Sequence, residues 1–220
     1  MVGPTSYDTA TRPGSVGLLT AEPGDDRPGP LAWQRTDTVG TELVLHHAGV
    51  ERLTAAGSAV VAGALPHTIG WAAELEPSWA VRALTVTCQG DGWSRTVRLR
   101  HDGPDGWTCR TEETGDLDEA PAGTDDPGRL DGAALVHLSD SPIFLTWALR
   151  RLALTPDSGP VCAPTIRVRT PSLTVLPGTS TYHLLSGRRL RISGAEPSTR
   201  YDLDDAGIVT YQPGRFRLVH

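Results

Sequence analysis

The chain has 220 residues, enough for one large β domain, and its formal net charge is −6. Its basic residues are all arginine and are spread along the chain. Nucleic acid requires a concentrated positive surface, so we exclude it as a partner. The 24 glycines and 18 prolines are typical of short strands joined by turns and argue against a helical protein.

Residues 1–30 are rich in Gly, Pro, Thr and Asp and contain few apolar side chains. Such a segment buries too little surface to offset the entropy lost on ordering, so we predict a disordered tail. The alternative is an arm that docks through Leu18 and Leu19. Residues 31–220 form the predicted folded domain.

From residue 31 the apolar residues recur with a period near two, which indicates strands. A bulge is expected near Arg82-Ala83, where the apolar phase shifts, and a hairpin turn at residues 89–92. The acidic segment 113–129 is predicted to be a solvated loop. Strands are predicted at 31–38, 41–47, 58–65, 68–76, 79–89, 93–101, 107–112, 130–138, 165–169, 172–176, 180–185, 188–193, 199–203, 207–212 and 215–219.

The longest apolar stretch, residues 135–154, is interrupted by a turn signal at 139–142. Ser141 is predicted to cap a helix whose first position is Pro142 and which continues over residues 143–149. This helix is apolar nearly all round, so it must be buried or cover a cavity. The sequence therefore predicts a mainly β, mostly antiparallel single domain with at most one or two short helices.

The sequence contains no recognisable catalytic or metal motif. His137, Ser139 and Asp140 are close in sequence, but neighbours on a strand point to opposite faces, and Asp140 and Ser141 suit a turn and a cap. There is no G-x-S-x-G motif, no paired-histidine spacing and no Gly-rich phosphate loop. We therefore expect no enzyme activity, no metal and no cofactor.

The three cysteines show no C-x-x-C spacing, so a disulfide framework or a zinc site is not expected. The N-terminus lacks the pattern of a signal peptide, and no window approaches the ~20 apolar residues of a membrane span. We interpret the chain as a reduced, cytoplasmic, soluble protein without an integral membrane segment.

Two residue types remain open to a functional interpretation. Arginines alternate with aliphatic residues at 97–100, 166–169, 189–192 and 215–218, which predicts either a solvated outer face or a basic surface for lipid head groups or a partner. Tryptophan is the most abundant aromatic residue and could fill a core or line a lipid pocket. The six tryptophans are Trp33, Trp71, Trp79, Trp93, Trp107 and Trp147.

Several segments carry a family resemblance. Residues 141–152 read SPIFLTWALRRL and match the pattern T-P-F-T-N-T-L-P-I-R-R-L. Near the start, Trp33 with Gly40-Thr41-Glu42 matches W…G-x-E; near the end, residues 204–209 and 213–217 match D-x-x-G-L-V and P-G-L-F-R. Over about residues 31–219 the chain thus resembles the bacterial putative glycolipid-binding family.

The chain departs from this pattern in its central stretch. Leu135 and His137 replace family acids, Phe144-Leu145 replaces the T-N pair, and Ala148 replaces the second proline. Of the late Q-x-Y, only Tyr182 is kept. The resemblance with these departures implies a more apolar site on a spiral β-roll, a long antiparallel sheet curled on itself. This fold is similar to the half-barrels of lipoprotein carriers, which hold acyl chains on their concave side.

The function implied by this resemblance is non-enzymatic binding of a lipid or glycolipid. Acyl chains would lie on the concave apolar face, covered by the helix as a lid, with an arginine pair at the rim. The residues expected to contact the ligand are Trp33, Trp71, Phe144, Trp147, Arg150, Arg151 and Tyr182. The alternatives are a protein–protein interaction module with a filled core and an unrecognised enzyme with a titratable group of displaced pKa in a cleft.

Overall fold

The structure is a computed structural model and describes residues 29–48, 53–185, 188–194 and 197–219. Of the predicted tail, Gly29 and Pro30 are described and are exposed. The remainder, including Leu18 and Leu19, lies outside the described residues.

The first half of the described chain forms an antiparallel meander in which each strand pairs with the next. The pattern of β4 shows why: Ile69, Trp71, Ala73 and Leu75 are buried, and the residues between them face the other side. The strands are β1 (Leu31–Arg35), β2 (Val39–Ala48), β3 (Leu53–Ala62), β4 (His67–Leu75), β5 (Val81–Gly90), β6 (Trp93–His101) and β7 (Trp107–Thr114).

The second half continues the same sheet, because β14 pairs with β1. The sheet runs from β7 through β1 and β14 to β8, and its neighbours are antiparallel except for the parallel pair β8–β9. These strands are β8 (Leu135–Leu138), β9 (Val161–Val168), β10 (Val175–Leu185), β11 (Arg189–Ser193), β12 (Thr199–Leu203), β13 (Val209–Gln212) and β14 (Phe216–Leu218).

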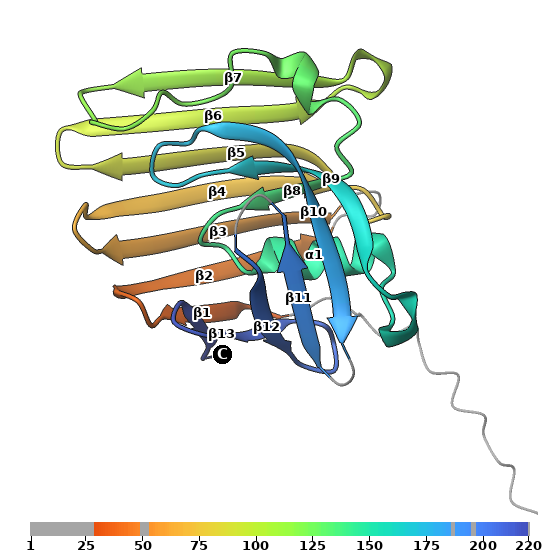
Figure 1. The fold of residues 1–220 in the computed structure, drawn as a ribbon. Helices are drawn as coiled ribbons and strands as arrows, with labels where there is room; N and C mark the ends of the chain where they lie inside the picture. Colours follow the sequence, from red (N-terminus) through yellow and green to blue (C-terminus); the bar gives the residue numbers. More distant parts are fainter. Residues whose placement is uncertain (1–28, 49–52, 186–187, 195–196, 220) are drawn as a thin grey trace, which may run out of the picture.

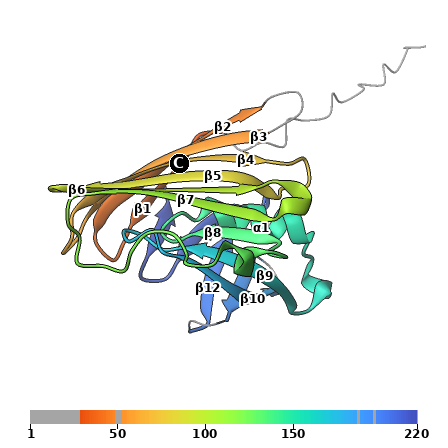
Figure 2. The ribbon, with the colours of Figure 1, turned by 90° about the horizontal axis from the view of Figure 1, so that it is seen from above.

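The sheet folds over on itself, so that β8–β13 lie across the concave side of the β1–β7 half (Figures 1 and 2). Helix α1 (Ile143–Leu152) lies between the two halves. Its residues Ile143, Phe144 and Trp147 join the larger core with β1–β7, while Leu145 and Leu149 join a smaller core with the C-terminal strands. The predicted curled, mainly β sheet is confirmed.

The predicted strands agree with the structure in most places. The bulge is confirmed, because Glu74 pairs with Ala83 and Leu75 with Val81, leaving Arg82 as the extra residue. The hairpin at 89–92 is confirmed as the two-residue connection between β5 and β6. Several predicted bounds were wrong. Residues 172–176 and 180–185 belong largely to one strand, β10, and the strand expected at 130–138 begins at Leu135, after a 3₁₀ turn at Pro127–Leu130. The strand expected at 31–38 ends at Arg35, the one expected at 58–65 is β3 at Leu53–Ala62, and the one expected at 165–169 begins at Val161.

The helix is present and extends three residues beyond its predicted end, to Leu152. It is buried around most of its circumference, as its composition required. Its predicted cap was wrong: Pro142 occupies the N-cap position and makes no side-chain capping bond. The hydroxyl of Ser141 instead donates a hydrogen bond to Glu42.

Candidate functional site

The residues expected to line an open concave face are core residues. Trp33 is fully buried on β1, and its indole N–H donates to the carbonyl of Val209 at 2.7 Å. Trp71 contacts Phe144 and Trp147 edge-on, with ring centroids 5.2 and 5.9 Å away. Phe144 and Trp147 are themselves 4.7 Å apart. Helix α1 therefore fills the position where a ligand was expected, and its aromatic residues are not a lid over open space.

A buried carboxylate ties this aromatic cluster to the turn before α1. Glu42, on β2, is 3% exposed, and its Oε1 accepts hydrogen bonds from the indole of Trp71 at 2.9 Å and from the hydroxyl of Ser141 at 2.5 Å. Burial raises the pKa of Glu42 to about 7, and the charge of Asp140 adds to the rise, although the two hydrogen bonds oppose it. Glu42 thus fixes the start of α1 from the opposite layer.

Asp140, in the same turn, holds two arginines that are distant in sequence. Arg35 lies 3.0 Å from its Oδ1, Arg215 donates to the same oxygen, and Thr170 donates to Oδ2 at 2.5 Å. Burial acts to raise the pKa of Asp140, but Arg215, Thr170 and Arg35 together lower it below its ordinary value. A Cβ at Gly40 would clash with the backbone carbonyl of Val60 and would also lie 2.8 Å from the Arg35 side chain, so glycine is needed here for the close approach of both.

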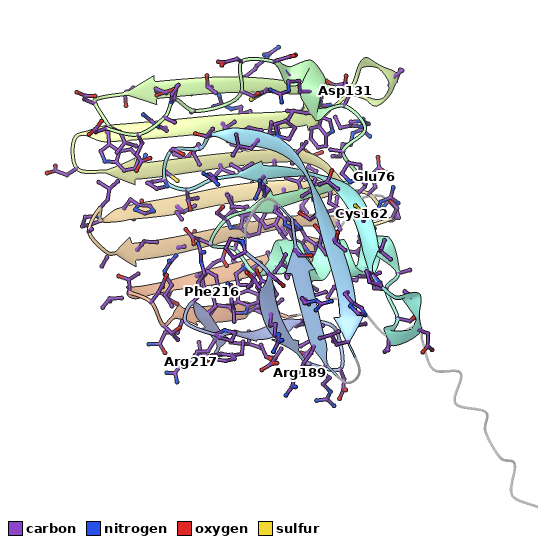
Figure 3. The ribbon with its side chains drawn as sticks, in the orientation of Figure 1. Glu76, Asp131, Cys162, Arg189, Phe216 and Arg217 are labelled. Carbon is purple, nitrogen blue, oxygen red and sulfur yellow. The ribbon has the colours of Figure 1, made fainter. Side chains whose placement is uncertain are left out.

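The turn also forms one wall of a polar cavity of about 120 Å³, which we call the arginine chamber. Its charged and histidine lining consists of His137, Asp140, Arg167, Arg169 and Arg215. An adjoining cavity of about 100 Å³ shares His137 and Arg167 with it. The arginines come from β9, the turn after it and the β13–β14 hairpin, next to Phe216, which Figure 3 labels.

Behind the chamber wall, His137 and Tyr182 form a buried pair. The Tyr182 hydroxyl lies 2.9 Å from Nε2 of His137, and Tyr182 itself is fully buried. Burial, and then the charge of Arg167, lower the pKa of His137 to about 4, so the imidazole is neutral at pH 7. Tyr182 thus contacts a chamber residue through its buried hydroxyl.

A larger, more open cavity lies at the other end of α1, and we call it the helix-end groove. Its volume is about 400 Å³. The apolar lining includes Leu149, Leu154, Leu184 and Leu203, and the charged lining includes Arg150, Arg188, Asp204 and Asp205. The two cavities are lined by different turns of α1, the chamber by Phe144 and Leu145 and the groove by Leu149 and Arg150.

The two arginines at the end of α1 have different surroundings. Arg150 lines the groove, stacks over the indole of Trp79 at 4.3 Å and donates to the carbonyl of Ala206 at 3.5 Å. Arg151 is exposed and lines neither the groove nor the chamber. The structure therefore brings one member of the expected pair to a cavity.

The alternating arginines are mostly on the outer face, as the solvated interpretation predicted. Arg98 pairs with Glu112 at 2.6 Å, and Arg189 and Arg217 point outward in Figure 3. Arg167 and Arg215 are exceptions, because they are partly buried at the chamber.

Sequence reasoning missed Arg95, which is 6% exposed. Its guanidinium donates to the carbonyls of Leu117, Glu119, Ala120 and Ser172 and so fixes the acidic loop. The predicted solvated loop is thus anchored on one side. A signal was present, because Arg95 falls in the same strand phase as Trp93 and Val97.

Cys88, Cys109 and Cys162 are free thiols. Within the described ranges, no three His, Cys, Asp or Glu side chains group as metal ligands. No helix in the described part of the chain is long and apolar enough to cross a membrane.

Residues 30–217 match a protein family described as putative glycolipid-binding. The chain belongs to this family. Among solved structures, it resembles a DUF1089 family protein from Pseudomonas aeruginosa, with 17% sequence identity and a TM-score of 0.61. That similarity covers 80% of this chain and 91% of the other, and at this identity it supports the fold alone. No curated protein matches the chain.

In this member of the putative glycolipid-binding family, three departures from the quoted pattern lie at the chamber. His137, Phe144 and Leu145 all line it. The apolar replacements Phe144 and Leu145 share this lining with three arginines, so the cavity is mixed in character.

Proposed function

We propose that the protein is a non-enzymatic binder of a lipid or glycolipid and that the ligand lies in the helix-end groove. The observation that carries the proposal is the mixed lining of the groove, which combines four leucines with arginine and aspartate side chains. The family description supports the same ligand class.

The size of the groove suits such a ligand. Its volume of about 400 Å³ falls within the ~300–1,000 Å³ that small-molecule sites occupy. Each methylene buried against Leu149, Leu184 or Leu203 contributes about 0.8 kcal/mol, so a segment of about six methylenes would supply roughly 5 kcal/mol before the cost of association. Part of an acyl chain can therefore drive binding.

The charged side of the groove would hold the polar head. Arg150 is held by Trp79 and Ala206, so its guanidinium is positioned before a ligand arrives. Arg188 forms an ion pair with Asp205, and both line the groove. Arginine donates hydrogen bonds to sugar hydroxyls and to phosphate, and aspartate accepts hydrogen bonds from sugar hydroxyls.

The decisive experiment is native mass spectrometry of the purified protein, followed by organic extraction and analysis of the extract. We expect a co-purifying lipid that Leu184→Glu removes, because this change places a carboxylate in the apolar side of the groove. Leu65→Glu is the matched control: Leu65 is 37% exposed between β3 and β4 and lines neither cavity.

A protein that is consistently empty, and whose melting temperature does not respond to added lipids, would contradict the proposal. Equal lipid content in wild type and Leu184→Glu would show that the ligand binds outside the groove.

One observation favours a second candidate function, an interaction module. Val39, Leu43, Leu45 and Val60 are exposed on the convex side of β2 and β3, while the concave side of these strands is filled. Apolar residues gathered on one face mark association surfaces. A Leu43→Glu, Leu45→Glu variant that removes a concentration-dependent increase in sedimentation coefficient would support this function, and a wild type that sediments as a monomer at all concentrations would contradict self-association.

A further inference from the structure

We propose that β7, the edge strand of the sheet, pairs with β7 of a second copy of this chain, antiparallel and around a two-fold axis at Thr111. This surface differs from the lipid groove and from the apolar residues of β2 and β3, so the pairing does not depend on the proposed function. Three features carry it: the outer edge of β7 is open, its backbone alternation restricts the register, and one register places opposite charges face to face.

The outer edge of β7 has no neighbouring strand. In the order of the sheet β7 comes first, and in the described part of the chain its ladder partner is β6 alone. Figure 1 shows β7 at the rim of the sheet. Its residues 110–114 are all exposed. A strand of eight residues with an open edge presents a row of N–H and C=O groups to which another strand can add.

The hydrogen bonds at the start of β7 show which of its backbone groups point outward. Asp102 donates to the carbonyl of Gly106, so Gly106 bonds toward β6, whereas the amide of Trp107 donates to the carboxylate of Asp131. In an antiparallel ladder these two orientations alternate along the strand. The residues whose amide and carbonyl groups point away from β6 are therefore Cys109, Thr111 and Glu113. None of these groups bonds to another backbone group of the described chain.

This alternation and two-fold symmetry together restrict the register. Outward-pointing residues must face outward-pointing residues, so the axis passes through a residue of β7 and not between two residues. An axis at Arg110 or at Glu112 would place two like charges directly opposite each other. An axis at Thr111 places Arg110 opposite the partner's Glu112, twice by symmetry, and an axis nearer either end of β7 would pair fewer residues. Opposite charges across a strand pair stabilise it and like charges destabilise it, so the axis at Thr111 is favoured.

Arg110 lacks a counter-charge within its own chain. It is exposed and lies directly opposite Arg98 on β6. Arg98 donates to both carboxylate oxygens of Glu112, at 2.6 and 3.3 Å, while the side chain of Arg110 makes no ion pair with the described residues. Two arginines thus share one carboxylate on the convex side. The partner's Glu112 would supply the missing negative charge on the open side of Arg110.

The remaining positions fit the same register. Thr108 comes opposite the partner's Thr114, and such threonine pairs are favourable across strands. On the concave side Cys109 comes opposite the partner's Glu113, whose charge is offset within its own chain by Arg95 at 3.2 Å. The outward backbone groups make about six intermolecular hydrogen bonds in this arrangement.

The test combines charge reversal with sedimentation velocity over a range of protein concentrations. We expect the wild type to form a species of twice the chain mass as concentration rises. Arg110→Glu alone and Glu112→Arg alone should each weaken this dimer about tenfold or more, because each places like charges opposite one another. An equimolar mixture of the two variants should restore the dimer, since every like-charge contact within each variant becomes an opposite-charge contact between them.

Thr111→Pro tests the backbone pairing itself. Proline removes an amide that points outward, so the β6–β7 ladder keeps its hydrogen bonds while the central intermolecular pair is lost. We expect this variant to be folded, by circular dichroism, and monomeric at concentrations at which the wild type is a dimer. Arg217→Glu is the matched control and should leave the dimer unchanged, because Arg217 is an exposed arginine on β14, in the interior of the sheet.

A wild type that is monomeric at all accessible concentrations overturns the proposal. A dimer that persists in both Arg110→Glu and Thr111→Pro also overturns it, and loss of that dimer in the Leu43→Glu, Leu45→Glu variant would then assign the contact to the convex side of β2 and β3. A mixture of the two charge-reversed variants that stays monomeric overturns the pairing of Arg110 with the partner's Glu112.

Discussion

Replacing Glu42 by glutamine should change how the stability of the protein depends on pH. In the folded state the pKa of Glu42 is about 7, compared with an ordinary value of 4.5, because the carboxyl is buried. Below pH 4.5 both folded and unfolded chains carry the protonated acid, so the group costs nothing. As pH rises, the unfolded chain ionises first, and stability falls until the folded carboxyl also ionises near pH 7.

The size of the effect follows from the pKa difference. The pKa of Glu42 is 4.5 in the unfolded chain and about 7 in the folded one, and at about 1.36 kcal/mol per pKa unit this difference lowers the free energy of unfolding above pH 7 by roughly 3 kcal/mol. Glutamine does not titrate but keeps an oxygen that can accept from Trp71 and Ser141. Its amide nitrogen would occupy the position of Oε2, which has no hydrogen-bond partner in the described structure, and that penalty is independent of pH.

The measurement is urea unfolding followed by tryptophan fluorescence at several pH values from 5 to 8. We expect the free energy of unfolding of Glu42→Gln, relative to wild type, to rise by roughly 2–3 kcal/mol over that range. The exposed residue Glu119 provides the matched control, Glu119→Gln, which should show no such rise. A difference between Glu42→Gln and wild type that is the same at pH 5 and pH 8 would refute the reasoning.

Three further predictions concern the elements that hold the site. Trp147→Ala should lower the free energy of unfolding by about 3–5 kcal/mol, because it leaves a cavity beside Phe144, and urea titration measures this loss. The lipid content per folded molecule should not change, which organic extraction checks. Arg95→Gln should release the acidic loop, which faster proteolysis within residues 115–126 would reveal, whereas an unchanged cleavage rate would contradict its anchoring role. Asp140→Asn should cost about 1–3 kcal/mol, since it removes the buried carboxylate that holds Arg35 and Arg215 together while Arg35 keeps its ion pair with Asp37, and thermal unfolding at pH 7 should show a lower Tm.

The sequence predicts individual strands well where the alternation is clean. Strand β6 matches its predicted bounds, 93–101, because Trp93, Val97 and Leu99 keep one phase. Residues 172–185 were divided wrongly because Pro177-Gly178 is typical of a turn. In β10 the two residues stay extended and pair with β9, since proline removes one donor without preventing an extended backbone.

The residues that meet at each site depend on the order of the strands in the sheet, and the periodicity of apolar residues along the chain does not reveal that order. Glu42 and Ser141 are 99 residues apart, and no local pattern indicates that they meet. Leu43 and Leu45 share one face of β2, yet that face is exposed, and the inward positions belong to Glu42 and Val44. The predicted Ser141 cap was wrong for the same reason: Glu42, from another layer, accepts the hydrogen bond of the Ser141 hydroxyl in place of a local capping bond.

The pairing of β1 with β14 has a consequence for how the protein is made. The register joins Trp33 to Leu218 and Arg35 to Phe216, so the first and last described strands meet near the middle of the sheet. During synthesis β1 keeps one unpaired edge until residues 216–218 leave the ribosome, and the halves on either side can be joined only then. We infer that the nascent chain carries an open sheet edge for most of its synthesis, when it is most exposed to aggregation and most in need of a chaperone.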